Sequence, residues 1–209
     1  MRYCDEMRGF RNGLKHLSEI CPHMQRAMEA YGRPKSRKRA PGFGTLVSII
    51  IDQQVSVQAG AAIRKRLDEL LGVVTPDAVL AAGEEGLRSA GLSGAKACYV
   101  SGIARAIDQG DINLEQLGRC REDTIRRELM ALKGIGLWTA DIYLMFAIGR
   151  PDILPIGDIA LQAAAGNLLG LKERPTPQEL GEIGKRWQPY RTVAAVMLWH
   201  YYKKMPAQT

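Results

Sequence analysis

The chain has 209 residues, of which 46% are hydrophobic, and its formal net charge is +7. This length and composition allow a buried core in one domain or in two small lobes. No apolar run reaches the about 18 residues that a membrane-spanning helix needs, and residues 1–6 contain no hydrophobic signal core. We therefore expect a soluble, intracellular protein without a membrane partner, in the bacterial cytoplasm or nucleoid, or in the nucleus of a eukaryote. We also expect a monomer.

The positive charge favours an anionic partner without identifying it, because ribosomal factors and peripheral membrane proteins are basic too. The cysteines show no spacing typical of a zinc site or a disulfide framework, which indicates a reducing compartment. They are Cys4, Cys21, Cys98 and Cys120.

Helical periodicity begins at residue 10 and continues to residue 31, with an interruption at Pro22. A basic connector (residues 32–42) follows and carries five positive charges. It fits two roles, contact with a phosphate backbone or a solvated surface loop. A buried helix is predicted for residues 43–51, and another, capped by Ser56, for residues 57–71.

The remaining predicted elements are also helices. A short one begins after Thr75, and a longer one begins after Ser93 and carries Lys96 and Tyr99, which we assign to packing within a lobe. Further helices are predicted for residues 113–119, 122–132, 138–149, 159–169, 176–187 and 190–203. Because no alternating strand pattern and no repeat occurs, the sequence predicts an all-α fold.

The turn between two of these helices forms a hairpin (residues 132–140). Gly134 and Gly136 flank one apolar residue, and we expect both to allow a sharp turn with positive φ. Main-chain N–H groups then lie at the N-terminus of the second helix, where the helix dipole favours a phosphate oxygen. The alternative is an ordinary helix–helix turn with a glycine at the C-cap.

An Asp loop (residues 152–158) follows, with the sequence Asp-Ile-Leu-Pro-Ile-Gly-Asp, directly before the helix at 159–169. A glycine-containing hairpin followed by a Pro/Gly loop that ends in Asp resembles the helix-hairpin-helix (HhH-GPD) DNA glycosylase superfamily. The sequences Gly-Ile-Gly-Leu-Trp-Thr-Ala at 134–140 and Leu-Pro-Ile-Gly-Asp at 154–158 are most similar to its alkylated-base branch, the 3-methyladenine DNA glycosylases II.

The resemblance covers roughly residues 43–203 and implies two helical lobes with a DNA-binding cleft between them. We assign residues 1–42 and 132–209 to the lobe with the hairpin, the Asp loop and the C-terminal helices. Residues 43–131 form the other lobe. Some alkyl-base enzymes have an additional N-terminal β-domain, for which this chain has no room.

The resemblance makes Asp158 the candidate catalytic carboxylate. Cleavage of an N-glycosidic bond builds positive charge on the sugar, and a nearby carboxylate stabilises that charge and orients or deprotonates water. The alternative is that Asp158 only caps the helix at 159–169, and the two roles are compatible. Asp141 and Asp152 are weaker candidates.

Aromatic side chains are expected to line the base pocket. By resemblance these are Trp138 and Trp199, with Tyr143 next to Ile142, the position where some relatives have a pocket tyrosine. An alkylated purine carries a positive charge, and stacking on tryptophan favours a cation by about 0.5–2 kcal/mol. Core packing is the alternative for each tryptophan and the one that we adopt for Trp187.

A wedge loop (residues 53–56) separates the helices at 43–51 and 57–71. In the family, the corresponding loop enters the minor groove and fills the space left by an extruded base. Gln54 is the candidate plug, and Gln53 is expected to hydrogen-bond within the protein, although two amides that stabilise a turn remain an alternative. The other predicted DNA contacts are Lys133, Gly134, Ile135, Gly136 and Thr139.

Position 138 bears on the reaction type. Bifunctional members of the family have a lysine there, which forms a Schiff base, so Trp138 predicts hydrolysis without strand cleavage. No cofactor and no iron–sulfur cluster is expected, because the C-terminal cysteine quartet of the cluster-containing branches is absent. The family implies one monovalent cation, Na⁺ or K⁺, on the carbonyls of Met130, Leu132 and Ile135.

The sequence thus predicts a base-excision-repair glycosylase that removes alkylated purines such as 3-methyladenine from double-stranded DNA. Two alternatives remain. One is a glycosylase for uracil, hypoxanthine or an oxidised purine, and the other is a non-catalytic DNA-binding protein that uses the hairpin alone.

Overall fold

The computed structural model describes residue 7 and residues 9–205, so Cys4 and the N-terminal segment 1–6 lie outside the described residues. The described residues form helices and loops without a β-strand, which confirms the predicted all-α fold. Contacts divide the chain into two units, Met1–Lys38 with Gly149–Thr209 (unit 1) and Arg39–Ile148 (unit 2).

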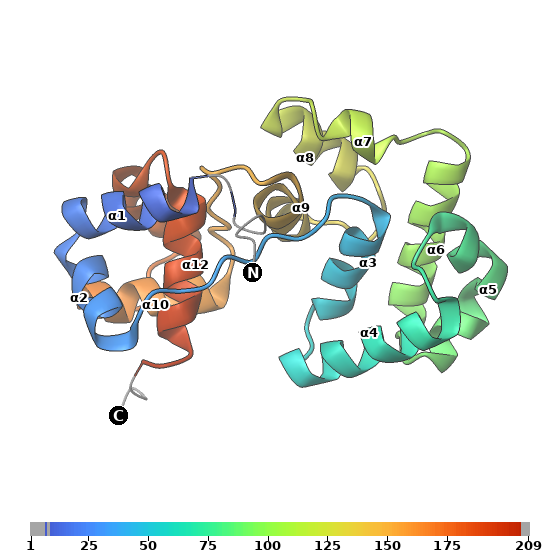
Figure 1. Cartoon of the computed structure of the whole chain (residues 1–209), viewed down its shortest axis with the longest axis horizontal. Coiled ribbons are helices and arrows are strands. Elements are labelled where there is room, and N and C mark those ends of the chain that lie inside the picture. Colours follow the sequence, from blue (N-terminus) through green and yellow to red (C-terminus); the bar gives the residue numbers. More distant parts are fainter. Residues whose placement is uncertain (1–6, 8, 206–209) are drawn as a thin grey trace. The chain divides into compact units, whose positions relative to one another are not determined.

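Unit 1 is built around its last helix. Helix α12 (Arg191–Tyr202) packs against α1 (Phe10–Ile20), α2 (Pro22–Tyr31) and α10 (Ile159–Leu169), as Figure 1 shows. Pro22 occupies the first turn of α2, where a missing N–H has no cost, so the proline separates α1 from α2 as predicted. A further helix, α11 (Pro177–Gly184), leads through a 3-10 turn to Trp187, which is fully buried in the core as expected.

Unit 2 contains the remaining helices. They are α3 (Phe43–Asp52), α4 (Val57–Leu71), α5 (Pro76–Ser89), α6 (Gly94–Asp108), α7 (Leu114–Leu117), α8 (Glu122–Met130) and α9 (Leu137–Tyr143). Helix α9 continues directly into a π-helical turn, Leu144–Ile148, which the sequence did not indicate. The apolar helix α3 packs against both α6 and α9.

The hairpin belongs to unit 2, whereas the sequence division placed it in the lobe of the C-terminal helices. Residues 139–143 of its second helix, α9, are buried, and α9 packs against α3. In addition, the N–H of Gly42, directly before α3, donates to the Tyr143 hydroxyl oxygen at 2.9 Å. These contacts explain why the chain divides at 148/149 rather than at 131/132.

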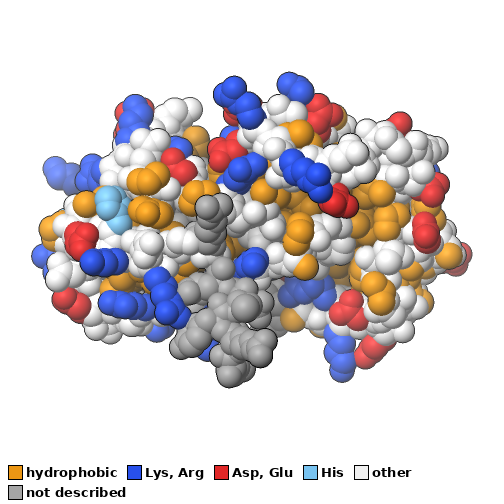
Figure 2. All heavy atoms as spheres, turned by 45° about the horizontal axis from the view of Figure 1, so that its top comes forward, with side chains coloured by type: hydrophobic (Ala, Val, Ile, Leu, Met, Phe, Trp, Pro, Cys, Tyr) orange, Lys and Arg blue, Asp and Glu red, His pale blue; other side chains and the backbone are white. Residues whose placement is uncertain are grey.

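The surface reflects the composition. Figure 2 shows one face of the molecule, on which Lys and Arg side chains are mixed with apolar and acidic side chains. Among the described residues, no helix combines the length and the apolar character needed to cross a bilayer.

Candidate functional site

The hairpin joins α8 to α9 through residues 131–136. Gly134 has φ 93°, and a Cβ there would overlap the ring of Tyr99 on α6, so this position requires glycine. Gly136 has φ −96°, which any residue adopts, so the prediction of a positive φ is confirmed for Gly134 and wrong for Gly136. A Cβ at Gly136 would meet only open space. Glycine at position 136 is therefore not required for the turn. Its missing side chain leaves the start of α9 open to the approach of a group from outside the protein.

Gly136 is also the N-cap of α9. No side chain caps this helix start, and a main-chain bond of 3.0 Å runs from Ala140 N to the Gly136 carbonyl. By helix geometry, the first N–H groups of α9 point toward the N-terminal end of the helix. Lys133 is exposed one residue before Gly134. This arrangement suits an anion, as the sequence predicts.

Two of the predicted DNA contacts serve an internal purpose. The Gln53 side-chain amide donates to the Gly134 carbonyl at 3.1 Å and to the Thr139 hydroxyl at 2.9 Å. This confirms that Gln53 hydrogen-bonds within the protein. Thr139 is 2% exposed, because its position on α9 faces α3, so a contact of its side chain with DNA is not supported. Together the two residues tie the wedge loop to the hairpin.

Gln54 is one of three exposed residues of the wedge loop. Its φ is 53°, in the left-handed region, and it is the only non-glycine residue with positive φ among the described residues. Such a conformation costs of order 1–3 kcal/mol and often occurs at functional positions. Its neighbour Val55 is also exposed, and Ser56 caps α4 by accepting from Ala59 N at 3.1 Å.

In unit 1 the structure places Asp158 and Trp199 in contact. Asp158 is the N-cap of α10, and its Oδ1 accepts a hydrogen bond from Leu161 N at 2.9 Å. The same oxygen accepts from the Trp199 indole N–H at 3.2 Å. Two N–H donors from different helices therefore fix the orientation of this carboxylate.

The basic connector reaches the same place. The Arg37 guanidinium lies over the Trp199 ring, 5.5 Å from its centre, which is cation–π geometry. The sequence shows that the connector is basic but contains no signal for this contact of Arg37. We expected the Trp199 indole to stack on a cationic base. One face of this indole already contacts the Arg37 cation.

The weaker catalytic candidates are both paired with arginine. Asp152 accepts from Arg191 Nε at 2.8 Å and from a terminal nitrogen of Arg191 at 2.9 Å, a two-pronged ion pair. Asp141 is buried and accepts from Arg126 Nε at 2.8 Å. These pairs join segments within each unit and give both carboxylates structural roles.

Trp138 is the second residue of α9 and is partly buried, in unit 2, whereas Trp199 and Asp158 lie in unit 1. Tyr143 is fully buried, and burial raises the pKa of its hydroxyl, which the hydrogen bond from Gly42 partly offsets. Five residues along an α-helix correspond to a rotation of about 140°, so Tyr143 points away from the direction of Trp138. The structure therefore does not support Tyr143 as a pocket residue.

The carbonyls predicted to hold a monovalent cation lie where α8 ends, at Met130. The C-terminal end of a helix carries a partial negative charge, which fits a cation. The Leu132 carbonyl also accepts from Ile135 N at 3.2 Å. The cation stays a prediction. No group of three His, Cys, Asp or Glu side chains that could hold a metal ion occurs among the described residues.

An all-helical chain with a glycine hairpin, and with an aspartate N-cap bonded to a tryptophan, has the features of a helix-hairpin-helix glycosylase. Comparison of the chain with known protein families gives the same result. Residues 47–189 match the model of the HhH-GPD superfamily of base excision DNA repair proteins. The chain belongs to this family.

Three relatives illustrate the similarity. The Bacillus subtilis protein YfjP is 28% identical over 75% of this chain, which spans 58% of that protein. The solved DNA-3-methyladenine glycosidase of Bacillus halodurans is 33% identical with a TM-score of 0.75, over 91% of this chain and 88% of that one. The solved 3-methyladenine DNA glycosylase (Mag1) of Schizosaccharomyces pombe, in complex with abasic DNA, is 25% identical with a TM-score of 0.86, over 95% of this chain and 100% of that one.

Proposed function

We propose that the protein is a DNA glycosylase of base excision repair that hydrolyses the N-glycosidic bond of alkylated purines, 3-methyladenine among them. It acts as a monomer on double-stranded DNA, in the cytoplasm or the nucleus, and swings the damaged base out of the helix. The observation that carries this proposal is the contact between Asp158 and Trp199, a fixed carboxylate next to an aromatic ring. The names of the two solved relatives support the choice of 3-methyladenine.

The mechanism follows from the charge of the base. An alkylated purine is cationic, so the electron pair of the breaking C1′–N bond neutralises it as it leaves. Positive charge develops on the sugar, and the Asp158 carboxylate stabilises it electrostatically. Water then adds to C1′, and the carboxylate orients it or accepts its proton. The hydrogen bonds from Leu161 and Trp199 hold the carboxylate in place through these steps.

DNA is held by the hairpin and the wedge loop. The N–H groups at the start of α9 and the Lys133 ammonium bind a phosphate, which positions the duplex without reading its sequence. Gln54 fills the gap left by the extruded base, because it is exposed and directly follows the fixed residue Gln53.

The reaction ends with base release. The position of the Schiff-base lysine of bifunctional relatives is occupied by Trp138. Reduction with borohydride during the reaction should therefore trap no covalent protein–DNA complex, and a trapped complex would contradict hydrolysis without lyase activity.

The central experiment is Asp158→Asn with duplexes that carry one lesion each, methylated purine, uracil, hypoxanthine or oxidised purine, followed by alkali to reveal abasic sites. Asparagine is an equally good N-cap, so folding and DNA affinity should be retained while base release is lost. Asp77→Asn, which removes an exposed charge from the first turn of α5, is the matched control and should leave release unchanged.

Each alternative predicts a different result. Release of neutral lesions in preference to methylated purines would assign the protein to another branch of glycosylases. DNA binding without release of any base, unaffected by Asp158→Asn, would indicate a protein that uses the hairpin alone.

A further inference from the structure

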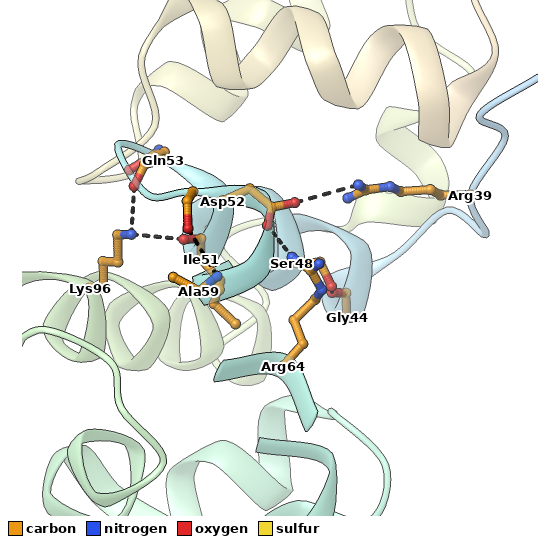
Figure 3. Close-up of polar contacts among 10 residues, drawn as sticks. Arg39, Gly44, Ser48, Ile51, Asp52, Gln53, Ala59, Arg64 and Lys96 are labelled. Atoms are coloured by element: carbon orange, nitrogen blue, oxygen red, sulfur yellow. Dashed lines mark hydrogen bonds and ion pairs between the residues drawn. The ribbon is translucent and has the colours of Figure 1, made fainter. Parts of the chain in front are cut away.

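The wedge loop is fixed on its N-terminal side by a lysine from another helix. Lys96, near the start of α6, donates from its Nζ to the Ile51 carbonyl at 2.8 Å and to the Gln53 carbonyl at 2.7 Å. Figure 3 shows its side chain pointing to these two carbonyls at the end of α3. A cation at the C-terminus of a helix is favourable, because the last carbonyls lack partners within the helix.

A second group fixes the residue between these two carbonyls. The Asp52 carboxylate pairs with Arg64 of α4 and, at 3.5 Å, with Arg39 of the basic connector. Figure 3 shows both arginines converging on it. The end of α3 is therefore held by charged contacts from α4, from α6 and from the connector.

The same helix that carries Lys96 also supports the hairpin. Tyr99, one turn after Lys96, fills the space next to Gly134. The Gln53 side chain joins the wedge loop to the hairpin by donating to the Gly134 carbonyl and to the Thr139 hydroxyl. The wedge loop and the hairpin thus share one support within unit 2.

These contacts end one residue before Gln54. The Gln53 carbonyl that Lys96 holds belongs to the peptide group that precedes the left-handed Gln54. An unusual backbone conformation persists only where its surroundings determine it. Burial lowers the pKa of Lys96, whereas the Asp52 carboxylate raises it, so this ammonium is partly desolvated next to a compensating charge.

We propose that Lys96 is a positioning residue for base extrusion. Its ammonium holds the Gln53 peptide group so that Gln54 keeps its left-handed conformation and its side chain stays aimed at the DNA. The inference rests on the proposed function, because it assumes that Gln54 replaces an extruded base. Lys96 itself touches neither the base nor the sugar.

The test is a double-mutant cycle between Lys96→Met and Gln54→Ala. Extrusion is followed by the fluorescence of 2-aminopurine placed next to the lesion, and excision by the single-turnover rate on a methylated-purine duplex. Lys96→Met should lower the 2-aminopurine signal and the excision rate about tenfold each. The Kd for an undamaged duplex should change less than about twofold. In the Gln54→Ala background, Lys96→Met should have no further effect, because both changes disable the same plug.

Two further variants sharpen the test. Lys65→Met removes an exposed ammonium from α4 in the same unit and should change neither readout. Lys96→Gln keeps an amide that can donate hydrogen bonds but removes the charge. It replaces Lys96→Met if that variant does not fold, with the same direction expected.

The outcomes separate this inference from the proposed function. Equal losses from Lys96→Met in the wild-type and the Gln54→Ala backgrounds would reduce Lys96 to a general support of the lobe, and an unchanged fluorescence would overturn the inference. An abasic-analogue duplex provides the second arm. A signal on it that depends on both Gln54 and Lys96, together with no release of any base from the lesion duplexes, would overturn the glycosylase and leave the positioning role intact.

Discussion

At the scale of single residues, the contact between Asp158 and Trp199 makes a prediction that does not depend on the lesion. Trp199→Phe keeps an aromatic ring on α12 but removes the N–H that donates to Asp158 Oδ1. A hydrogen bond to a charged group contributes about 1.5–3 kcal/mol, so the excision rate should fall about 10- to 100-fold if the bond persists in the transition state. Single-turnover kinetics on a methylated-purine duplex measures this.

Trp187→Phe is the matched control for this prediction. Trp187 is fully buried in the same unit, and among the described residues its indole N–H has no hydrogen-bond partner. Its replacement leaves a cavity and should lower the free energy of unfolding by about 1–2 kcal/mol without changing the excision rate. Equal kinetic losses in both variants would mean that Trp199 acts through packing alone.

At the scale of elements, the two hairpin glycines should separate stability from DNA binding. Gly134→Ala forces an alanine to φ 93° and into the Tyr99 ring, so it should destabilise the fold by about 1–3 kcal/mol. Gly136→Ala fits the backbone and has open space, so the free energy of unfolding should change by less than about 0.5 kcal/mol. DNA affinity should nevertheless fall, because a methyl group then blocks the approach of a phosphate.

Urea unfolding together with a DNA-binding titration distinguishes these two effects. Normal DNA affinity in Gly136→Ala would indicate that the turn is an ordinary helix connection. That result would count against a phosphate site at the start of α9.

A second element, α11, predicts a pH dependence. The Glu179 carboxylate accepts from Thr176 N at 2.8 Å and from its hydroxyl at 2.9 Å, which lowers the pKa of Glu179 below 4.5. Because the folded pKa is the lower one, the stabilisation is present above pH 4.5 and is lost as pH falls through the folded value. Glu179→Gln should therefore show a smaller loss of stability than the wild type between about pH 6 and about pH 3. An identical pH dependence would show that the hydrogen bonds between Glu179 and Thr176 do not contribute.

The helix starts were predictable because their signals are local. Ser56, Thr75, Ser93, Asp158 and Thr176 each cap a helix with a side-chain bond, as their residue types indicate. The π-helical turn after α9 and the break at Gly83 inside α5 were not predicted. Residues 144–147 of the π-helical turn are buried, and Gly83 breaks α5 with φ 66°; periodicity describes neither feature.

In the candidate site, too, residues in local motifs were predictable, and contacts between distant residues were not. Asp158 and Trp199 lie in short recognisable motifs, and the structure brings them together. Tyr143 and Thr139 are buried and bonded within the protein, which proximity to the hairpin in sequence did not indicate, because it does not fix which face of α9 a side chain occupies. The ring that Arg37 contacts, Trp199, lies 162 residues away in the chain, and the Ile51 carbonyl to which Lys96 donates lies 45 residues away. Neither a distant ring contact nor a bond to a distant backbone carbonyl has a sequence signature.

At the scale of the whole molecule, the net charge of +7 raises the question of which cations meet DNA. In the basic connector, Arg37 contacts Trp199 and Arg39 pairs with Asp52. Arg33, Lys35 and Lys38 are exposed. The two roles left open for the connector, phosphate contact and solvated loop, therefore concern these three side chains.

The salt dependence of binding decides between the two roles. Each phosphate contact adds about 0.9 to the slope of log K against log salt, so Lys35→Ala with Lys38→Ala should reduce that slope by up to about 2 if both lysines bind phosphates. Lys15→Ala with Lys65→Ala removes the same charge from exposed sites on α1 and α4 and serves as the control. Equal slopes for the two double variants would show that the connector lysines only add to the general field of the protein. A reduced slope for the connector variant alone, with an unchanged excision rate at saturating DNA, would place this segment on the phosphate backbone.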